Sequence, residues 1–288
     1  QKVSVDAGFT CPNVDGKVTT GGCTFCDNRS FSPSRRIKRQ DILDQITDGI
    51  RRLQIRYDCD TFIAYFQPAT NTYGRLEKLR SVYERALEHP QVVGMAIGTR
   101  PDCVPDEVLN LLEEIAGRTY LAVEYDCFPD AMQRSRGRGF EICAHVMLGL
   151  PGESHDDMLA TAREMAKQNP DSIKIHNLYC VKDTPLADQV ARGEVQLMER
   201  AEYVRTLVDF LELLPPTMIV ERVSGDAPPD YLVGPNWTLD KPGLLNALEQ
   251  EFQSRDTWQG KLWREGHANP VSTIRVNRNS TPSSDGFR

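Results

Sequence analysis

Residues 141–168 read EICAHVMLGLPGESHDDMLATAREMAKQ, and this stretch decides the fold. Its first eight residues are mostly apolar, which is typical of a buried strand. Gly149 and Gly152 follow and permit a tight turn. Ser154 then fits the N-cap of a helix, because acidic residues occupy the next positions. The stretch therefore predicts a strand, a turn and a helix, in that order.

The same order recurs along the chain. Short β-rich runs alternate with longer amphipathic runs, which is typical of a parallel sheet with right-handed crossovers. The predicted strands cover residues 3–7, 61–66, 93–99, 119–125, 141–148 and 172–179. The predicted helices cover residues 41–57, 76–88, 105–117 and 154–168. We therefore expect an α/β protein, a partial (β/α)6 TIM-like barrel with its ligands at the carboxyl ends of the strands.

One connection is shorter than its neighbours. Residues 127–140 give it 14 residues, whereas the neighbouring connections have 24, 19 and 21. Fourteen residues barely hold a crossover helix. Either this βα unit is reduced, or a piece of it is absent from the sequence.

The alternation fades after residue 184. Helices are predicted over 198–214 and 242–255, with a strand and turn over 218–226. We expect a core barrel over 1–184 and a small C-terminal α+β extension over 185–265. The polar end of the chain, 266–288, predicts a disordered tail.

Composition narrows the class of protein. The chain has 288 residues, a formal net charge of −7 and eight cysteines, most of them dispersed. No apolar run is long enough for a membrane span and no signal peptide is visible, so we expect reduced thiols in a cytoplasmic protein without a membrane partner. The acidic balance counts against broad nucleic-acid binding, although basic islands at 34–39 and 134–140 could form a local groove.

Three cysteines gather near the N-terminus, in CPNVDGKVTTGGCTFC over residues 11–26. A structural zinc site would need a distant fourth ligand, such as Cys59 or Cys103. A thioredoxin-type pair would leave Cys11 unexplained. Three thiolates suit a 4Fe-4S cluster that keeps one iron open to a small molecule.

The segment resembles the cluster motif of the radical S-adenosylmethionine (SAM) superfamily, including the aromatic residue before the last cysteine. Its long first gap, C-x11-C-x2-C, is the form of the YhcC/YtqA-like subgroup, which is allied to the elongator catalytic subunit. Further segments resemble that subgroup: AYFQPATNTY, IGTRPDCVPDEVL, HVMLGLPGES, VKDTPLA, SGDAPPDYLVGPNW and WQGKLW. The chain departs from it at 125–140, where the family carries a longer insert with a Gln-Ser pair and an Arg-Gly-His.

The resemblance implies an enzyme with two cofactors, a 4Fe-4S cluster and SAM. Cys11, Cys23 and Cys26 would ligate three irons, and the fourth would bind SAM. One electron would cleave SAM to a 5′-deoxyadenosyl radical that abstracts hydrogen from substrate. The residues expected to contact SAM are Phe25, Gln67, Thr70, Asn71, Arg100, Glu124 and Leu150. The weaker substrate-side candidates are His176, Lys182 and Asp226, and no catalytic residue is assigned.

Some of these residues also have structural readings. Arg100 could pair with Asp102, Glu124 could be an exposed charge at a strand end, and strand histidines such as His145 and His176 are often hydrogen-bonded sheet residues. Gln67, Thr70 and Asn71 could form an ordinary polar turn.

The resemblance implies tRNA wobble-uridine modification as the leading function, with flavodoxin or ferredoxin as electron donor. A small molecule, peptide or protein substrate stays open, as does a non-catalytic iron–sulfur or zinc module. The oligomeric state is not predicted.

Overall fold

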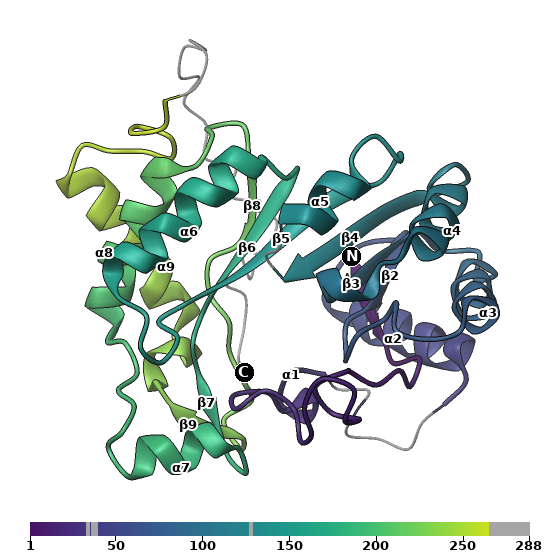
Figure 1. Cartoon of the computed structure of the whole chain (residues 1–288), viewed down its shortest axis with the longest axis horizontal. Helices are drawn as coiled ribbons and strands as arrows, with labels where there is room; N and C mark the ends of the chain where they lie inside the picture. Colours follow the sequence, from purple (N-terminus) through teal and green to yellow (C-terminus); the bar gives the residue numbers. More distant parts are fainter. Residues whose placement is uncertain (33–34, 36–39, 127–128, 265–288) are drawn as a thin grey trace, which may run out of the picture.

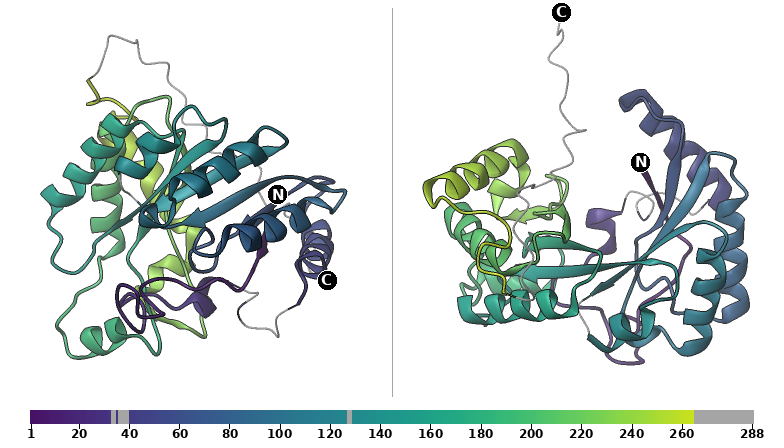
Figure 2. Two further views of the ribbon diagram at one scale, coloured as in Figure 1. Left: turned by 45° about the vertical axis from the view of Figure 1, so that its right-hand side comes forward. Right: turned by 90° about the horizontal axis from the view of Figure 1, so that it is seen from above.

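A single parallel sheet forms the centre of the molecule, in a computed structural model that describes residues 1–32, 35, 40–126 and 129–264. The sheet has seven strands in the order β1-β2-β3-β4-β5-β6-β8, and each neighbouring pair is parallel. The strands are β1 (Lys2–Val5), β2 (Phe62–Phe66), β3 (Val92–Thr99), β4 (Tyr120–Asp126), β5 (Glu141–Leu148), β6 (Ser172–Asn177) and β8 (Ile219–Arg222). The sheet curls into an open half-barrel (Figure 2), which confirms the predicted fold class.

Helices cover the convex face of this sheet (Figure 1). They are α2 (Ile42–Arg56), α3 (Leu76–Leu87), α4 (Asp106–Ala116), α5 (Pro129–Ser135) and α6 (His155–Gln168). Alternate strand residues such as Val3, Val5 and Ile173 face these helices and are buried in one core. We call the opposite, concave side the inner face of the sheet. Its side chains come from the remaining alternate positions.

The unit over 141–168 forms as its sequence predicts. Strand β5 is largely buried, and Gly149 turns the chain with a φ of 83°. Ser154 caps α6 in a capping box, because its hydroxyl accepts from the Asp157 N–H while the Asp157 carboxylate accepts from the Ser154 N–H. Sequence and structure agree here because every signal is local.

The short connection after β4 contains a short helix, so it forms a reduced βα unit. Helix α5 has seven residues, and Ala131 and Met132 are buried beneath it. The Tyr125 and Ser135 hydroxyls are 2.7 Å apart, which ties the helix to β4. Residues 127 and 128 lie outside the described residues. A crossover can therefore be made in this space with a helix of two turns.

The C-terminal part adds a seventh strand to the core sheet. Strand β8 pairs with β6, while α8 (Arg200–Leu213) packs between α6 and α9 (Lys241–Ser254). The other elements are α1 (Asn28–Phe31), α7 (Pro185–Ala191), the antiparallel pair β7 (Cys180–Val181) and β9 (Leu232–Gly234), and the 3-10 helices Pro101–Cys103 and Asn236–Leu239. The domain boundary at 184 stays a prediction, and the tail at 266–288 lies outside the described residues.

None of the described helices combines the length and the apolar character that crossing a membrane would require.

Candidate functional site

The three cysteines lie on the loop that joins β1 to α1. The Cys11 carbonyl accepts from the Val14 N–H at 2.8 Å, which starts one turn, and the Cys26 N–H donates to the Cys23 carbonyl at 3.0 Å, which closes another. Gly21 and Gly22 sit between the turns with φ angles of 85° and 93°, a region that glycine adopts without strain. The local sequence thus folds both ends of the motif back toward each other.

Three backbone contacts hold this loop at the carboxyl edge of the sheet (Figure 1). The Thr70 N–H, just beyond β2, donates to the Thr10 carbonyl at 3.2 Å, and the Ala69 N–H donates to Asn28 Oδ1 at 3.3 Å. On the other side, the Leu186 N–H of α7 donates to the Thr24 carbonyl at 3.0 Å. The cysteines therefore lie where parallel α/β folds place their ligands.

The three cysteine thiols lie near one another without forming a tight group. Burial and the charges of Cys23 and Cys11 together raise the pKa of the Cys26 thiol to about 12, and the effect of those charges shows that the three thiols lie near one another. They do not form a group whose ligand atoms all lie within 4.8 Å of one another. A zinc ion with Zn–S bonds of about 2.3 Å would need sulfurs about 3.8 Å apart.

A cluster of several irons takes each thiolate on a different iron, so its sulfurs stand further apart. The structure thus brings the three predicted metal residues near one another on one loop. Asn13 adds a hydrogen bond, because its Nδ2 donates to Cys23 Sγ at 3.1 Å. Donors to ligand sulfurs are one means by which a protein adjusts a cluster's reduction potential.

Two predicted SAM contacts, Phe25 and Leu150, meet beside this loop. Both are partly buried against the same apolar cluster, which is built around Leu178, Cys180 and Leu186. Phe25 comes from the cysteine loop and Leu150 from the turn after β5. The structure thus creates an apolar wall next to Cys26 from segments 125 residues apart in the sequence.

Of the predicted SAM contacts after β2, two have structural roles and one has a side chain without a hydrogen bond to a described residue. Asn71 is fully buried, and its Nδ2 donates to the Phe66 carbonyl at 2.9 Å and the Gly98 carbonyl at 3.0 Å. It therefore holds the ends of β2 and β3 together. Thr70 is buried and anchors the cysteine loop through its backbone. Gln67 is half-buried, and its side chain makes no hydrogen bond within the described residues.

Arg100 forms the ion pair that its sequence context allows. Its Nε lies 2.9 Å from Asp102 Oδ1 and its Nη2 lies 2.8 Å from Asp102 Oδ2. The hydrogen bonds to Asp102 raise the pKa of Arg100, and they lower the pKa of Asp102. A carboxylate ligand for Arg100 would have to compete with this bidentate contact.

Glu124 lies on the inner face and is buried, with 2% of its surface exposed. It is therefore not the exposed strand-end charge that its sequence position also allowed. Its carboxylate accepts from Lys2 Nζ at 3.0 Å, from the Tyr65 hydroxyl at 2.5 Å and from Lys174 Nζ. His145 Nε2 lies 3.2 Å from its second oxygen. Four strands besides β4 thus converge on one carboxylate.

These contacts keep Glu124 ionised. Burial alone would raise the pKa of this carboxyl, but the hydrogen bond from His145 and the charges of Lys174 and Lys2 hold it well below its usual range. Glu221 of β8 joins the same network, 3.1 Å from Lys2 Nζ. We call Lys2, Tyr65, Glu124, His145, Lys174 and Glu221 the inner-face network.

Sequence reasoning missed most of this network. The signal was available in the period of two: polar residues such as Lys2, Tyr65 and Lys174 alternate with apolar residues that face the helices. Which of them pair, however, depends on strands up to 219 residues apart in the chain. Only the curled sheet brings these strands to one carboxylate.

A second group could in principle hold a metal ion. Ligand atoms of Glu124, Cys143 and His145 all lie within 4.8 Å of one another. The two lysine ammonium groups on Glu124 oppose this, because a divalent cation would sit beside two positive charges. The group therefore fits an ion-pair network better than a metal site.

Of the predicted substrate-side residues, His176 faces the inner network. Its ring centroid lies 5.5 Å from that of His145. Burial, followed by the charge of His145, lowers the pKa of His176 well below its usual value, so the ring is neutral. Lys182 is exposed, and Asp226 pairs with Lys241 at 2.9 Å.

Tyr179 was not predicted and lies between the cysteines and the inner face. Burial raises its pKa to about 12, and the charges of Cys26 and Asp226 act in the same direction. A hydrogen bond with Ser30 and the charge of Arg222 act against them. Gly225 packs beside it, because an added Cβ there would stand 3.0 Å from Tyr179 Cε1 and 2.8 Å from His176 Nδ1.

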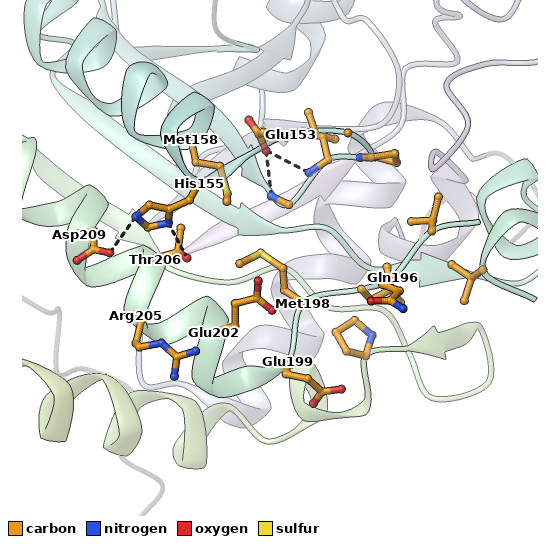
Figure 3. Close-up of a pocket in the computed structure, with 18 of the residues that line it drawn as sticks. Glu153, His155, Met158, Gln196, Met198, Glu199, Glu202, Arg205, Thr206 and Asp209 are labelled. Carbon is orange, nitrogen blue, oxygen red and sulfur yellow. Dashed lines mark hydrogen bonds and ion pairs between the residues drawn. The ribbon is translucent and has the colours of Figure 1, made fainter. Parts of the chain in front are cut away.

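A separate depression of about 920 Å³ lies between α6, α8 and the turn after β5 (Figure 3). Glu153 closes that turn by accepting from the N–H groups of Gly149 and Leu150, at 3.0 and 3.1 Å. His155 Nε2 pairs with Asp209 at 3.2 Å on the opposite wall. The cysteines do not line this pocket, so we place the candidate site at the cysteine loop.

Comparisons with known proteins show which family the chain resembles. Residues 170–254 match the Radical_SAM C-terminal domain family. YtqA of Bacillus subtilis (strain 168) is 36% identical over 282 residues, which cover 91% of this chain and 88% of YtqA. A tRNA uridine(34) acetyltransferase of Dehalococcoides mccartyi (strain CBDB1) is 26% identical over 236 residues, covering 74% of this chain and 50% of that protein.

Among solved structures, an archaeal Elp3 of Methanocaldococcus infernus superposes with a TM-score of 0.65 at 16% identity, covering 90% of this chain and 63% of Elp3. The fold is therefore shared with Elp3. The identity with YtqA over nearly the whole of both chains establishes a family relationship. The chain belongs to the YhcC/YtqA-like subgroup of the radical SAM enzymes, whose cofactors are a 4Fe-4S cluster and SAM.

Proposed function

We propose that Cys11, Cys23 and Cys26 hold the 4Fe-4S cluster of this radical SAM enzyme. The observation that carries the proposal is their convergence on one loop that backbone hydrogen bonds hold at the carboxyl edge of the sheet. When bound, the cluster holds SAM at its open iron and delivers the electron that cleaves it to methionine and a 5′-deoxyadenosyl radical, which takes hydrogen from substrate.

The protein's own residues supply orientation and exclude water. Phe25 and Leu150 form an apolar wall that suits a flat adenine ring, and Gln67 offers a free amide at the carboxyl end of β2. Thr70 and Asn71 shape the backbone around that amide. Arg100 and Glu124 are held by ion pairs in this state, so they act by setting the charge around SAM.

The proposed substrate is a uridine of tRNA at the wobble position. Support comes from the similarity to a tRNA uridine(34) acetyltransferase over 74% of this chain. Flavodoxin or ferredoxin is the proposed electron donor, and the cytoplasm is the proposed location.

The ion pairs of the basic residues favour a second candidate function, which acts on a small-molecule or protein substrate instead of tRNA. In the basic island at 134–140, Arg134 pairs with Asp106 at 2.7 Å and Arg138 with Glu113 at 2.8 Å. These arginines are therefore not free for phosphates. The residues of the other island at 34 and 36–39 lie outside the described part of the chain.

Anaerobic reconstitution tests the cluster and the chemistry. We expect about four irons and four sulfides per chain, and deoxyadenosine release from SAM once a strong reductant is added. One zinc per chain without SAM cleavage would show a non-catalytic module instead.

Nucleoside mass spectrometry of tRNA tests the substrate. A deletion strain should lose one wobble-uridine modification, and the wild-type gene should restore it whereas a Cys23→Ala gene should not. An unchanged modification profile would favour the small-molecule or protein substrate.

A further inference from the structure

A bulge at the end of β8 turns two consecutive residues toward the inner face. Ile173 pairs with Val220 and Lys174 with Arg222, so Glu221 is an extra residue in β8. Glu221 faces inward, because its carboxylate lies 3.7 Å from Lys174 Nζ. Arg222 is paired across the sheet with Lys174, whose side chain reaches Glu124, and paired residues of parallel strands point to the same side. Arg222 therefore faces inward as well.

The surroundings of Arg222 support this orientation. Its charge acts on Tyr65, His176 and Tyr179, which lie on the inner face or at its carboxyl edge. The guanidinium therefore stands near the neutral ring of His176, whose Nε2 is buried without a hydrogen-bond partner in the described part of the chain. Tyr179 responds to the charges of both Cys26 and Arg222, so both groups lie near it.

Arg222 is the cation of this region that lacks a counter-ion. Lys2 and Lys174 are satisfied by the carboxylates of Glu124 and Glu221. Asp226, the next acidic residue along the chain, pairs with Lys241. Arg222 is exposed, and none of the described residues forms an ion pair or a hydrogen bond with its guanidinium.

We propose that Arg222 binds an anionic group of the substrate, a phosphate or a carboxylate, on the inner face beside Tyr179. A guanidinium presents parallel N–H donors that match the oxygens of either anion. An anion held there would place the rest of its molecule next to Tyr179, toward the cysteine loop. The proposal deepens the proposed function, on which it rests for the identity of the ligand as substrate.

Isothermal titration calorimetry on the full chain tests the site with three probes: inorganic phosphate, uridine 5′-monophosphate and malonate. The wild-type protein should bind at least one of them. Arg222→Gln should weaken that binding by at least about tenfold, because a charge-assisted hydrogen bond is lost. Arg222→Lys should retain part of the affinity. Arg52 of α2 is exposed and forms no ion pair with a described residue, so it gives the matched control. Arg52→Gln should bind the probes like wild type.

The three probes distinguish a phosphate from a carboxylate as the anionic group of the substrate. Arg222-dependent binding of phosphate and uridine 5′-monophosphate supports a phosphate-bearing substrate, and Arg222-dependent binding of malonate alone supports a carboxylate. The proposal is overturned if wild type binds none of the probes, or if Arg222→Gln binds them equally well. The measurement requires no cluster and no SAM cleavage, so its failure and that of reconstitution are separate results.

Discussion

Lys2 Nζ lies 3.0 Å from Glu124 and 3.1 Å from Glu221, and it thereby joins the first strand of the sheet to the last across the inner face. Strands β1 and β8 are the two edges of the half-barrel and do not pair with each other. A charged side chain thus links edges that backbone hydrogen bonds leave apart. The inner face is consequently polar and held together by ion pairs, whereas the outer face is apolar.

Removing one buried partner of Glu124 should destabilise the fold. Lys174 and Glu124 have side chains only 6% and 1% exposed. Lys174→Met should lower the free energy of unfolding by about 2 kcal/mol, less than for a completely unpaired buried charge because Lys2 remains. Urea unfolding measures this, with Arg52→Gln as a control that should stay within about 0.5 kcal/mol of wild type.

The double variant Glu124→Leu/Lys174→Met should regain most of the lost stability, since no buried charge is then left without its partner. If Lys174→Met alone unfolds like wild type, the ion pair contributes nothing to stability.

Lowering the pH should reduce the stability of the fold, because Glu124 stabilises it in the ionised form. Its pKa in the folded state lies well below the value of about 4.3 for an unfolded glutamate. The unfolded chain therefore binds a proton first as the pH falls, and stability is lost below about pH 5. The unfolding free energy of Glu124→Gln should depend less steeply on pH between about 5 and 3. Equal slopes for variant and wild type would contradict the ionised state of this carboxyl.

Gly225 should not accept a larger side chain. An alanine Cβ would stand 2.8 Å from His176 Nδ1 and 3.0 Å from Tyr179 Cε1, both in half-buried rings. Gly225→Ala should cost about 1–3 kcal/mol of stability through overpacking, measured by urea unfolding. Gly117→Ala is the matched control, because its Cβ would be 3.5 Å from the Glu114 carbonyl, an ordinary contact. Similar stabilities for the two variants would refute this packing.

Cysteine substitutions should show which thiols are ligands of the cluster and which are not. Cys11→Ala, Cys23→Ala and Cys26→Ala should each prevent normal cluster assembly, seen as lost iron and sulfide and lost visible absorbance after reconstitution. Cys59→Ala should retain the cluster, because Cys59 packs against the core before β2, at the amino edge of the sheet. Cys103→Ala should retain it as well. Loss of metal with either of these two variants would revive a four-ligand site.

The sequence by itself determined the elements whose signals are local. The apolar run of β5, the Ser154 cap and the apolar faces of α2, α3 and α4 each depend on residues close together in the sequence, so the pattern predicts them directly. The cysteine motif is equally local. Its two turns and glycines bring the thiols together before the rest of the fold is considered.

Only the tertiary structure decided which strands and charged side chains come together on the inner face of the sheet. Strand β8 reads as part of a C-terminal extension, yet it completes the core sheet because its partner is β6, some 45 residues earlier. Glu124 could be a SAM contact or an exposed strand-end charge by sequence, and curling of the sheet buries it among Lys2, Tyr65 and Lys174. The pairing of charges and the bulge that turns Arg222 inward depend on contacts between distant strands, and a linear pattern does not encode those contacts.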